Sequence, residues 1–190
     1  MFKFYYWGPL LFHTKLDSDA LKKIDKLCYK NEDLNHRVRL AGHIQGEYLI
    51  NPKELEKVLE NSFKKFNEAY QHWYNCNDDF YINSSWVNYM KKGEYNPVHT
   101  HDKCDLSAVL YLSVPDEIKK ENETFVGTDL GPGSIRFIIS SYTPGFISQQ
   151  SFMPETGDMF IFPAHLMHMV APFKSDVERV SVAFNMKRKI

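Results

Sequence analysis

Two segments of this chain carry histidines with the spacing of a metal site. The first holds His99 and His101, two positions apart, and the second holds His168 much later in the chain. Because side chains two positions apart on a β-strand point to the same face, His99 and His101 can direct both imidazoles at one point. A third imidazole from a distant strand would complete a three-ligand face with open positions, as an oxygen-activating iron site requires. The spacing therefore predicts a metal site of this kind.

Residues close to these histidines are weaker candidates for the same site. His165 lies in a turn-like approach and is expected at the mouth of the site. Asp102 or Asp105 could supply a carboxylate in place of His101, although strand alternation points Asp102 to the opposite face. Cys104 is near in sequence, but such iron sites prefer imidazole and carboxylate ligands. Which residue completes the site, and whether the site is active or degenerate, stays open at this point.

A buried cation is expected near the end of the chain. Arg179 lies in an otherwise apolar, strand-like segment, where an unpaired positive charge would be costly. Either a structural salt bridge, for which Asp176 and Glu178 are candidates, or a bound anion would offset that cost.

The segments before residue 80 have helical patterns. Apolar residues recur at helical spacing in two stretches, the first preceded by Asp17 and the second by Asn51 and Pro52, which are typical of helix starts. The expected elements are short β segments at 2–7 and 10–13, a helix over about 18–30, an irregular connection or hairpin over 31–50, and a helix from 51 to about 75. We expect the two helices to cover one face of a sheet.

From residue 80 onward, short β-branched and aromatic segments are separated by Gly and Pro turns. The expected strands are 80–90, 94–101, 106–113, 123–129, 134–141, 146–152, 157–162, 166–171 and 178–186. Many short strands at this spacing are typical of a sandwich or barrel. We therefore expect one domain over residues 1–190, with 1–79 as a helical N-terminal support and 80–190 as an antiparallel all-β core.

Composition limits the class of protein. Hydrophobic residues make up 43% and aromatic residues 15%, which argues against disorder. The formal net charge of −1 gives no electrostatic support for nucleic-acid binding. The N-terminus lacks the pattern of a signal peptide and no apolar window has the length of a membrane span, so a soluble, cytoplasmic protein is expected. A homodimer is compatible with the aromatic N-terminus or an exposed sheet edge.

Several of these segments resemble a known family. Residues 93–101 followed by 106–112 resemble the first metal strand of prolyl-4-hydroxylase-like oxygenases, which depend on iron(II) and 2-oxoglutarate. Residues 157–163 and 168–172 resemble the distal-histidine strand of that family, and 179–181 resembles its Arg-x-Ser element. The likeness covers about residues 80–190 and is nearest to a largely uncharacterised bacterial and phage branch with a His-x-His, His and Arg-x-Ser pattern.

The resemblance implies a fold, an activity and a set of site residues. The fold is a double-stranded β-helix, or jelly roll, with N-terminal α-helices packed on it. The activity is that of a non-haem iron(II)- and 2-oxoglutarate-dependent dioxygenase, a hydroxylase that releases succinate and carbon dioxide, with ascorbate considered as an accessory cofactor. The implied metal ligands are His99, His101 and His168, and the implied 2-oxoglutarate contacts are Arg179, Ser181 and Tyr111.

One departure from the family and two other functions remain open. The commonest family pattern has Asp or Glu where this chain has His101. The alternatives are a cupin-like metal protein that does not use 2-oxoglutarate and a non-catalytic jelly-roll binding module. Arg179 with Ser181 argues against the first, and three convergent histidines argue against the second. The substrate, a small molecule or a peptide, cannot be read, although loops at 114–123 and 140–152 are expected to shape its entry.

Overall fold

The computed structural model describes residues 8–139 and 148–189. Its elements in chain order are β1 (Phe12–Lys15), α1 (Ser18–Asp25), the 3₁₀ turns η1 (Glu32–Leu34) and η2 (Arg37–Arg39), β2 (Gly46–Leu49), α2 (Pro52–Val58), α3 (Glu60–Tyr74), β3 (Phe80–Met90), β4 (Asn96–His99), β5 (Leu106–Ser113), α4 (Asp116–Glu123), β6 (Ile135–Ile138), β7 (Gln149–Phe152), β8 (Asp158–Pro163), β9 (Met167–Val170) and β10 (Arg179–Arg188).

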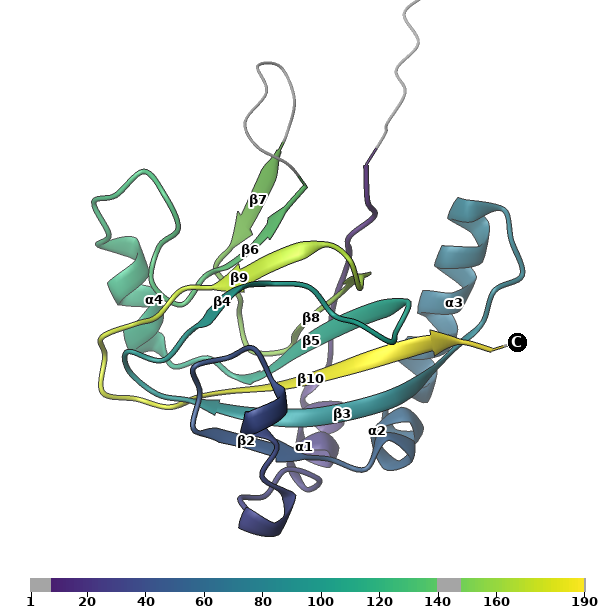
Figure 1. The fold of residues 1–190 in the computed structure, drawn as a ribbon, viewed down its shortest axis with the longest axis horizontal. Coiled ribbons are helices and arrows are strands. Elements are labelled where there is room, and N and C mark those ends of the chain that lie inside the picture. The colour runs from purple at the N-terminus through teal and green to yellow at the C-terminus, as the bar shows by residue number, and fades with distance from the viewer. Residues whose placement is uncertain (1–7, 140–147, 190) are drawn as a thin grey trace, which may run out of the picture.

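The strands form two antiparallel sheets. The larger has six strands in the order β1-β8-β5-β10-β3-β2, and the smaller has four in the order β4-β9-β6-β7. The smaller sheet lies over one face of the larger, and α1, α2 and α3 lie on the other side (Figure 1). Strands β1 and β2 come from the N-terminal part of the chain, so that part contributes to the main sheet as well as supplying helices.

Two hydrophobic cores follow from this layering. One lies between the helices and the larger sheet and contains Ile24, Leu55 and Phe63 from the helices. The other lies between the sheets, where Phe160 of β8 and Phe137 of β6 belong to one buried cluster. Burial of these side chains on both faces of the larger sheet supplies the main favourable free energy of folding.

The two faces of strand β10 have different roles, one in the hydrophobic core and one in a cavity. Val182, Phe184 and Met186 belong to the core under the helices. Arg179 and Ser181, on the opposite face, line a cavity between the sheets. Successive side chains of a strand point to opposite faces, so the residues that alternate with the apolar core residues of β10 face the cavity.

The helix starts agree with the capping residues, whereas the helix lengths differ from expectation. Asp17 Oδ1 accepts from the backbone N–H of Ala20 (2.8 Å), and Asn51 Oδ1 accepts from that of Lys53 (3.0 Å). The first helix ends at Asp25 rather than near residue 30. The expected second helix divides into α2 and α3 at Leu59.

Two other expectations were wrong. Residues 116–123 form α4 instead of a loop, because Ile118 on that helix is fully buried. Residues 123–129 form no strand, since Phe125 and Val126 are exposed (42% and 97%) with no neighbouring strand to pair with. The expected segment at 2–7 lies outside the described residues, as does most of the loop at 140–152.

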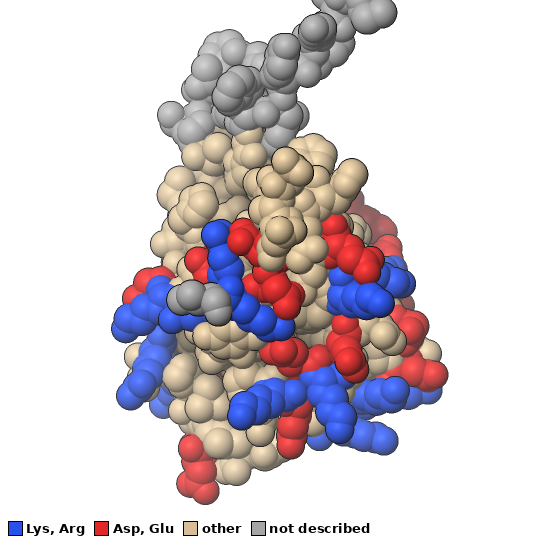
Figure 2. Space-filling model, turned by 90° about the vertical axis from the view of Figure 1, so that its right-hand side faces the viewer, with Lys and Arg blue, Asp and Glu red and all other residues tan. Residues whose placement is uncertain are grey.

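Charge is mixed on the surface. On the face seen in Figure 2, Lys and Arg side chains are interspersed with Asp and Glu and form no continuous basic patch among the described residues. Within the described residues no helix is both long and apolar enough to cross a membrane.

Candidate active site

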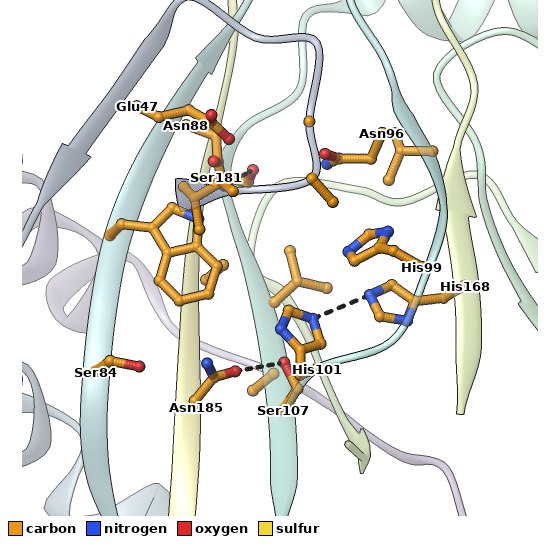
Figure 3. A pocket seen from close by; sticks show the side chains of 18 of the residues that line it. Glu47, Ser84, Asn88, Asn96, His99, His101, Ser107, His168, Ser181 and Asn185 are labelled. Atoms are coloured by element: carbon orange, nitrogen blue, oxygen red, sulfur yellow. Dashed lines mark hydrogen bonds between the residues drawn. The ribbon is translucent and has the colours of Figure 1, made fainter. Parts of the chain in front are cut away.

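Strand pairing brings the three histidines together. In the antiparallel pair β4–β9, His99 stands directly opposite His168. His101 follows β4, and its backbone N–H donates to the Ala164 carbonyl (2.9 Å). The candidate ligand atoms of His99, His101 and His168 all lie within 4.8 Å of one another, and the Nε2 atoms of His101 and His168 are 3.2 Å apart (Figure 3). The spacing of a metal-binding cluster is therefore present.

The backbone orients two of these imidazoles. His99 Nδ1 lies 2.8 Å from the Pro97 carbonyl oxygen, and His168 Nδ1 lies 2.9 Å from the Leu166 carbonyl oxygen. When Nδ1–H donates to a carbonyl, the lone pair is on Nε2, which is then available to a metal. The hydrogen bonds thus select the tautomer that a metal site needs.

Burial keeps these imidazoles neutral. It lowers the pKa of His168 to about 3, with further lowering by its neighbour His99, and it lowers the pKa of His101 to about 4. The pKa of His99 is lowered by the same cause. A metal binds neutral imidazole, so the cluster requires no proton release at neutral pH.

The weaker ligand candidates do not join the cluster. His165 and Asp102 are exposed, and Asp102 lines the cavity but is not among the grouped ligand residues. The Asp105 carboxylate accepts from the backbone N–H of Arg188 (2.8 Å). Cys104 is also absent from the group of candidate ligand residues. All-imidazole ligation is therefore what the arrangement supports.

Arg179 is a buried cation with no acidic partner among the described residues. Its side chain is 2% exposed, its Nη1–H donates to the Gly133 carbonyl (2.8 Å), and its Nη2 lies against Met90 Sδ. Its Nε atom is buried and has no hydrogen-bond partner within residues 8–139 and 148–189. The two acids expected as salt-bridge partners pair elsewhere, Glu178 with Lys30 and Asp176 with Lys92.

Tyr111 and Ser181 lie beside this guanidinium. The Arg179 guanidinium carbon is 5.3 Å from the centre of the Tyr111 ring. Tyr111 is fully buried, its hydroxyl has no hydrogen-bond partner among the described residues, and burial raises its pKa to about 12. Ser181 stands opposite Tyr111 across β10 and β5. Arg179 Nε–H and Tyr111 Oη–H, which have no acceptor among the described residues, therefore lie near the Ser181 hydroxyl, and a bound anion could accept hydrogen bonds from them.

All six predicted site residues line one cavity of about 480 Å³. That volume lies within the usual range for small-molecule sites, roughly 300–1,000 Å³. Trp86 and Asn88 of β3 line the same cavity, as does Glu47 of β2, which the sequence did not single out. The available signal for Glu47 was a single acidic residue within the strand-like run 46–49.

The comparison with protein families decides the class. The family described as "Putative 2OG-Fe(II) oxygenase" matches residues 84–185, which is more than half of the chain. The chain belongs to this 2OG-Fe(II) oxygenase family. It is thus an oxidoreductase that uses iron(II) and 2-oxoglutarate on a substrate that remains unknown.

Solved structures share the fold of this oxygenase. A Pseudomonas putida prolyl-4-hydroxylase is 16% identical with a TM-score of 0.59, covering 94% of this chain and 93% of its own. A viral collagen prolyl hydroxylase from Paramecium Bursaria Chlorella virus-1, in a 2OG complex, is 15% identical with a TM-score of 0.60, covering 95% and 96%. HygX from Streptomyces hygroscopicus, with nickel and 2-oxoglutarate bound, is 13% identical with a TM-score of 0.52, covering 95% and 82%. A search of curated proteins found no match.

Proposed function

We propose that this oxygenase is a hydroxylase whose iron is held by His99, His101 and His168. The single observation that carries the proposal is that these histidines share one cavity with a buried arginine that has no acidic partner among the described residues. A structural arginine would have an acidic partner within the protein, whereas a co-substrate anion would supply that negative charge on binding.

The co-substrate contacts follow from the same geometry. Arg179 can form two parallel hydrogen bonds with the far carboxylate of 2-oxoglutarate, a match that a planar guanidinium provides. Tyr111 Oη, which has no hydrogen-bond partner in the described part of the chain, and Ser181 Oγ can donate to the same group. The anion would then satisfy donors that are otherwise buried at a cost.

The chemistry requires metal ligands that are neutral and held in a fixed orientation. Bound iron(II) and 2-oxoglutarate supply oxidation of the substrate by dioxygen, with succinate and carbon dioxide as co-products. The chain contributes imidazoles that are neutral and oriented by backbone carbonyls. With no carboxylate in the cluster, both positive charges of the ion are left for the dianionic co-substrate to offset, which strengthens its attraction to the cavity.

The fold supports the same proposal. Two facing antiparallel sheets with helices on the outside fit a double-stranded β-helix in which residues 80–190 form the core and 1–79 support it. Hydroxylation is the proposed reaction because two of the structural neighbours are described as prolyl hydroxylases.

Anaerobic titration of the metal-free protein tests this function. Iron(II) is added first and 2-oxoglutarate second, while the weak visible charge-transfer band of the chelate is followed. We expect a band in the wild type, no band in His168→Ala, and an unchanged band in the matched control His165→Ala, since His165 is exposed and outside the cluster. Tight iron binding without the band would favour a cupin-like protein, and no iron binding would favour a binding module.

A further inference from the structure

Two acceptor atoms in the cavity wall have no hydrogen-bond partner among the described residues. Glu47 and Asn88 are 1% and 6% exposed, and Glu47 Oε2 and Asn88 Oδ1 are both buried and unpaired. The β2–β3 pairing places Glu47 directly opposite Asn88, and residues at such positions have Cβ atoms roughly 5 Å apart. Both side chains line the same cavity as the histidines. They form a paired acceptor site, defined here as Glu47 with Asn88.

The neighbouring glutamate shows that the protein satisfies a buried acid when its role is structural. Glu94 is 8% exposed, but its carboxylate accepts from the backbone N–H groups of Gln45 (3.0 Å) and Lys91 (2.8 Å). Glu47 has no such donors on Oε2, and within the described residues no Lys or Arg pairs with it. Burial and the nearby Glu94 raise the pKa of Glu47 to about 8.

The paired acceptor site lies across the cavity from the histidines. Figure 3 shows Glu47 and Asn88 at one end with Ser181, while His99, His101 and His168 lie on the opposite side. The segment 36–44 closes over this end, since an ideal Cβ on Gly42 would lie 3.2 Å from Glu47 Oε1. A molecule between these walls would touch the acceptors and the histidines together.

The cavity therefore offers recognition of two opposite charges. Arg179 is suited to an anion, which the proposed function assigns to the co-substrate, whereas the paired acceptors are suited to a donor. Burial keeps Glu47 mostly protonated at neutral pH, and a bound cation favours its ionised form because the two charges then compensate each other, which a neutral donor cannot do. A guanidinium or ammonium group also carries several N–H donors, enough to reach two acceptors at once.

We propose that the primary substrate presents a basic nitrogen group, an ammonium or a guanidinium, to Glu47 and donates a second N–H to Asn88. This proposal rests on the proposed function, since Arg179 must be taken by 2-oxoglutarate. Glu47 is then the residue that determines specificity for a cationic substrate, and the substrate class is an amine- or guanidine-bearing molecule.

A pair of isosteric probes tests this assignment. Butylguanidinium and its neutral counterpart butylurea are titrated calorimetrically into protein loaded with 2-oxoglutarate and with nickel(II), which replaces iron(II) so that no turnover occurs. We expect wild type to bind butylguanidinium at least about tenfold more tightly than butylurea, and Glu47→Gln to lose this preference. Glu68→Gln, which removes the same charge from the exposed surface of α3, should keep the preference.

The 2-oxoglutarate titration of the same samples separates this inference from the proposed function. If wild type and Glu47→Gln bind 2-oxoglutarate equally but neither prefers butylguanidinium, only the present inference is overturned. A large loss of 2-oxoglutarate affinity in Glu47→Gln would also overturn it, because Glu47 would then belong to the co-substrate site. Absence of 2-oxoglutarate binding in wild type would overturn both. Thermal unfolding of each variant confirms that it is folded.

Discussion

Replacing Arg179 with Met removes the cation proposed to hold the co-substrate and keeps similar side-chain volume. Arg179 is 2% exposed and, in the part of the chain that the structure describes, has only neutral contacts, so no acid there compensates its positive charge. Breaking a buried ion pair by removing one partner costs about 3–5 kcal/mol. Since each 1.4 kcal/mol is a factor of ten, the Kd for 2-oxoglutarate should rise at least about 100-fold. The free energy of unfolding of the metal-free variant should equal or exceed that of the wild type, because the variant no longer buries an unpaired charge.

Arg136 provides a matched control. It is also buried, but its guanidinium pairs with Asp129, and its Nε–H donates to Ser151 Oγ (2.9 Å). Arg136→Met should lower the free energy of unfolding by about 1 kcal/mol and leave 2-oxoglutarate affinity unchanged. Arg179→Met is thus expected to lose 2-oxoglutarate affinity without losing stability, whereas Arg136→Met is expected to lose stability without losing 2-oxoglutarate affinity.

Two measurements complete the experiment. Iron(II)-loaded protein is titrated anaerobically with 2-oxoglutarate, and the metal-free variants are unfolded in urea. If Arg179→Met binds 2-oxoglutarate as tightly as the wild type does, the proposed contact between Arg179 and the far carboxylate is refuted. A loss of several kcal/mol of stability in Arg179→Met, without loss in Arg136→Met, would show instead that Arg179 is structural.

Three further predictions concern single side chains. Tyr111→Phe removes a buried hydroxyl that has no partner among the described residues, so urea unfolding should give equal or greater stability. Titration should give a roughly fivefold weaker affinity for 2-oxoglutarate, and unchanged affinity would exclude Tyr111 from the site. The folded-state pKa of Glu47 is raised from 4.5 to about 8, so its contribution to stability is complete below about pH 4.5 and is lost as pH rises through about 8. Relative to Glu47→Gln, wild type should therefore lose about 5 kcal/mol between pH 4.5 and 8 in urea unfolding, and parallel pH profiles would contradict the burial of the charge. Gly42→Val places a Cβ against Asn96 Oδ1, so it should lower the free energy of unfolding by about 1–2 kcal/mol in thermal or urea unfolding, and no loss would mean that segment 36–44 is free to move.

Local patterns predicted the parts of the site that lie on one strand. Arg179 and Ser181 lie two positions apart on β10, as alternation requires. The expected strand 94–101 is shorter in the structure, because β4 ends at His99 and His101 follows it, so sequence proximity rather than alternation brings these two imidazoles together. Helix starts at Asp17 and Asn51 were predicted for the same reason, because a cap involves only the next few residues. The chemistry of the site was therefore readable wherever the relevant neighbours are adjacent in sequence.

Helix α4 and the failed strand at 123–129 show where local pattern was insufficient. Charged residues dominate 116–123, and the helix depends on Ile118 reaching the core between the sheets. Residues 123–129 have strand-like residue types, but a strand requires a partner with unpaired backbone groups, and none lies beside it among the described residues.

The sequence by itself determined which residue types share a strand face, and through its motifs it indicated the iron and 2-oxoglutarate chemistry. Tertiary structure alone decided that His168 stands opposite His99, that Arg179 has no acidic partner among the described residues, and that Glu47 reaches the cavity from β2. The physical reason is the range of the interactions. Alternation and capping act over a few residues, whereas strand register depends on the burial of whole faces by segments far apart in the chain.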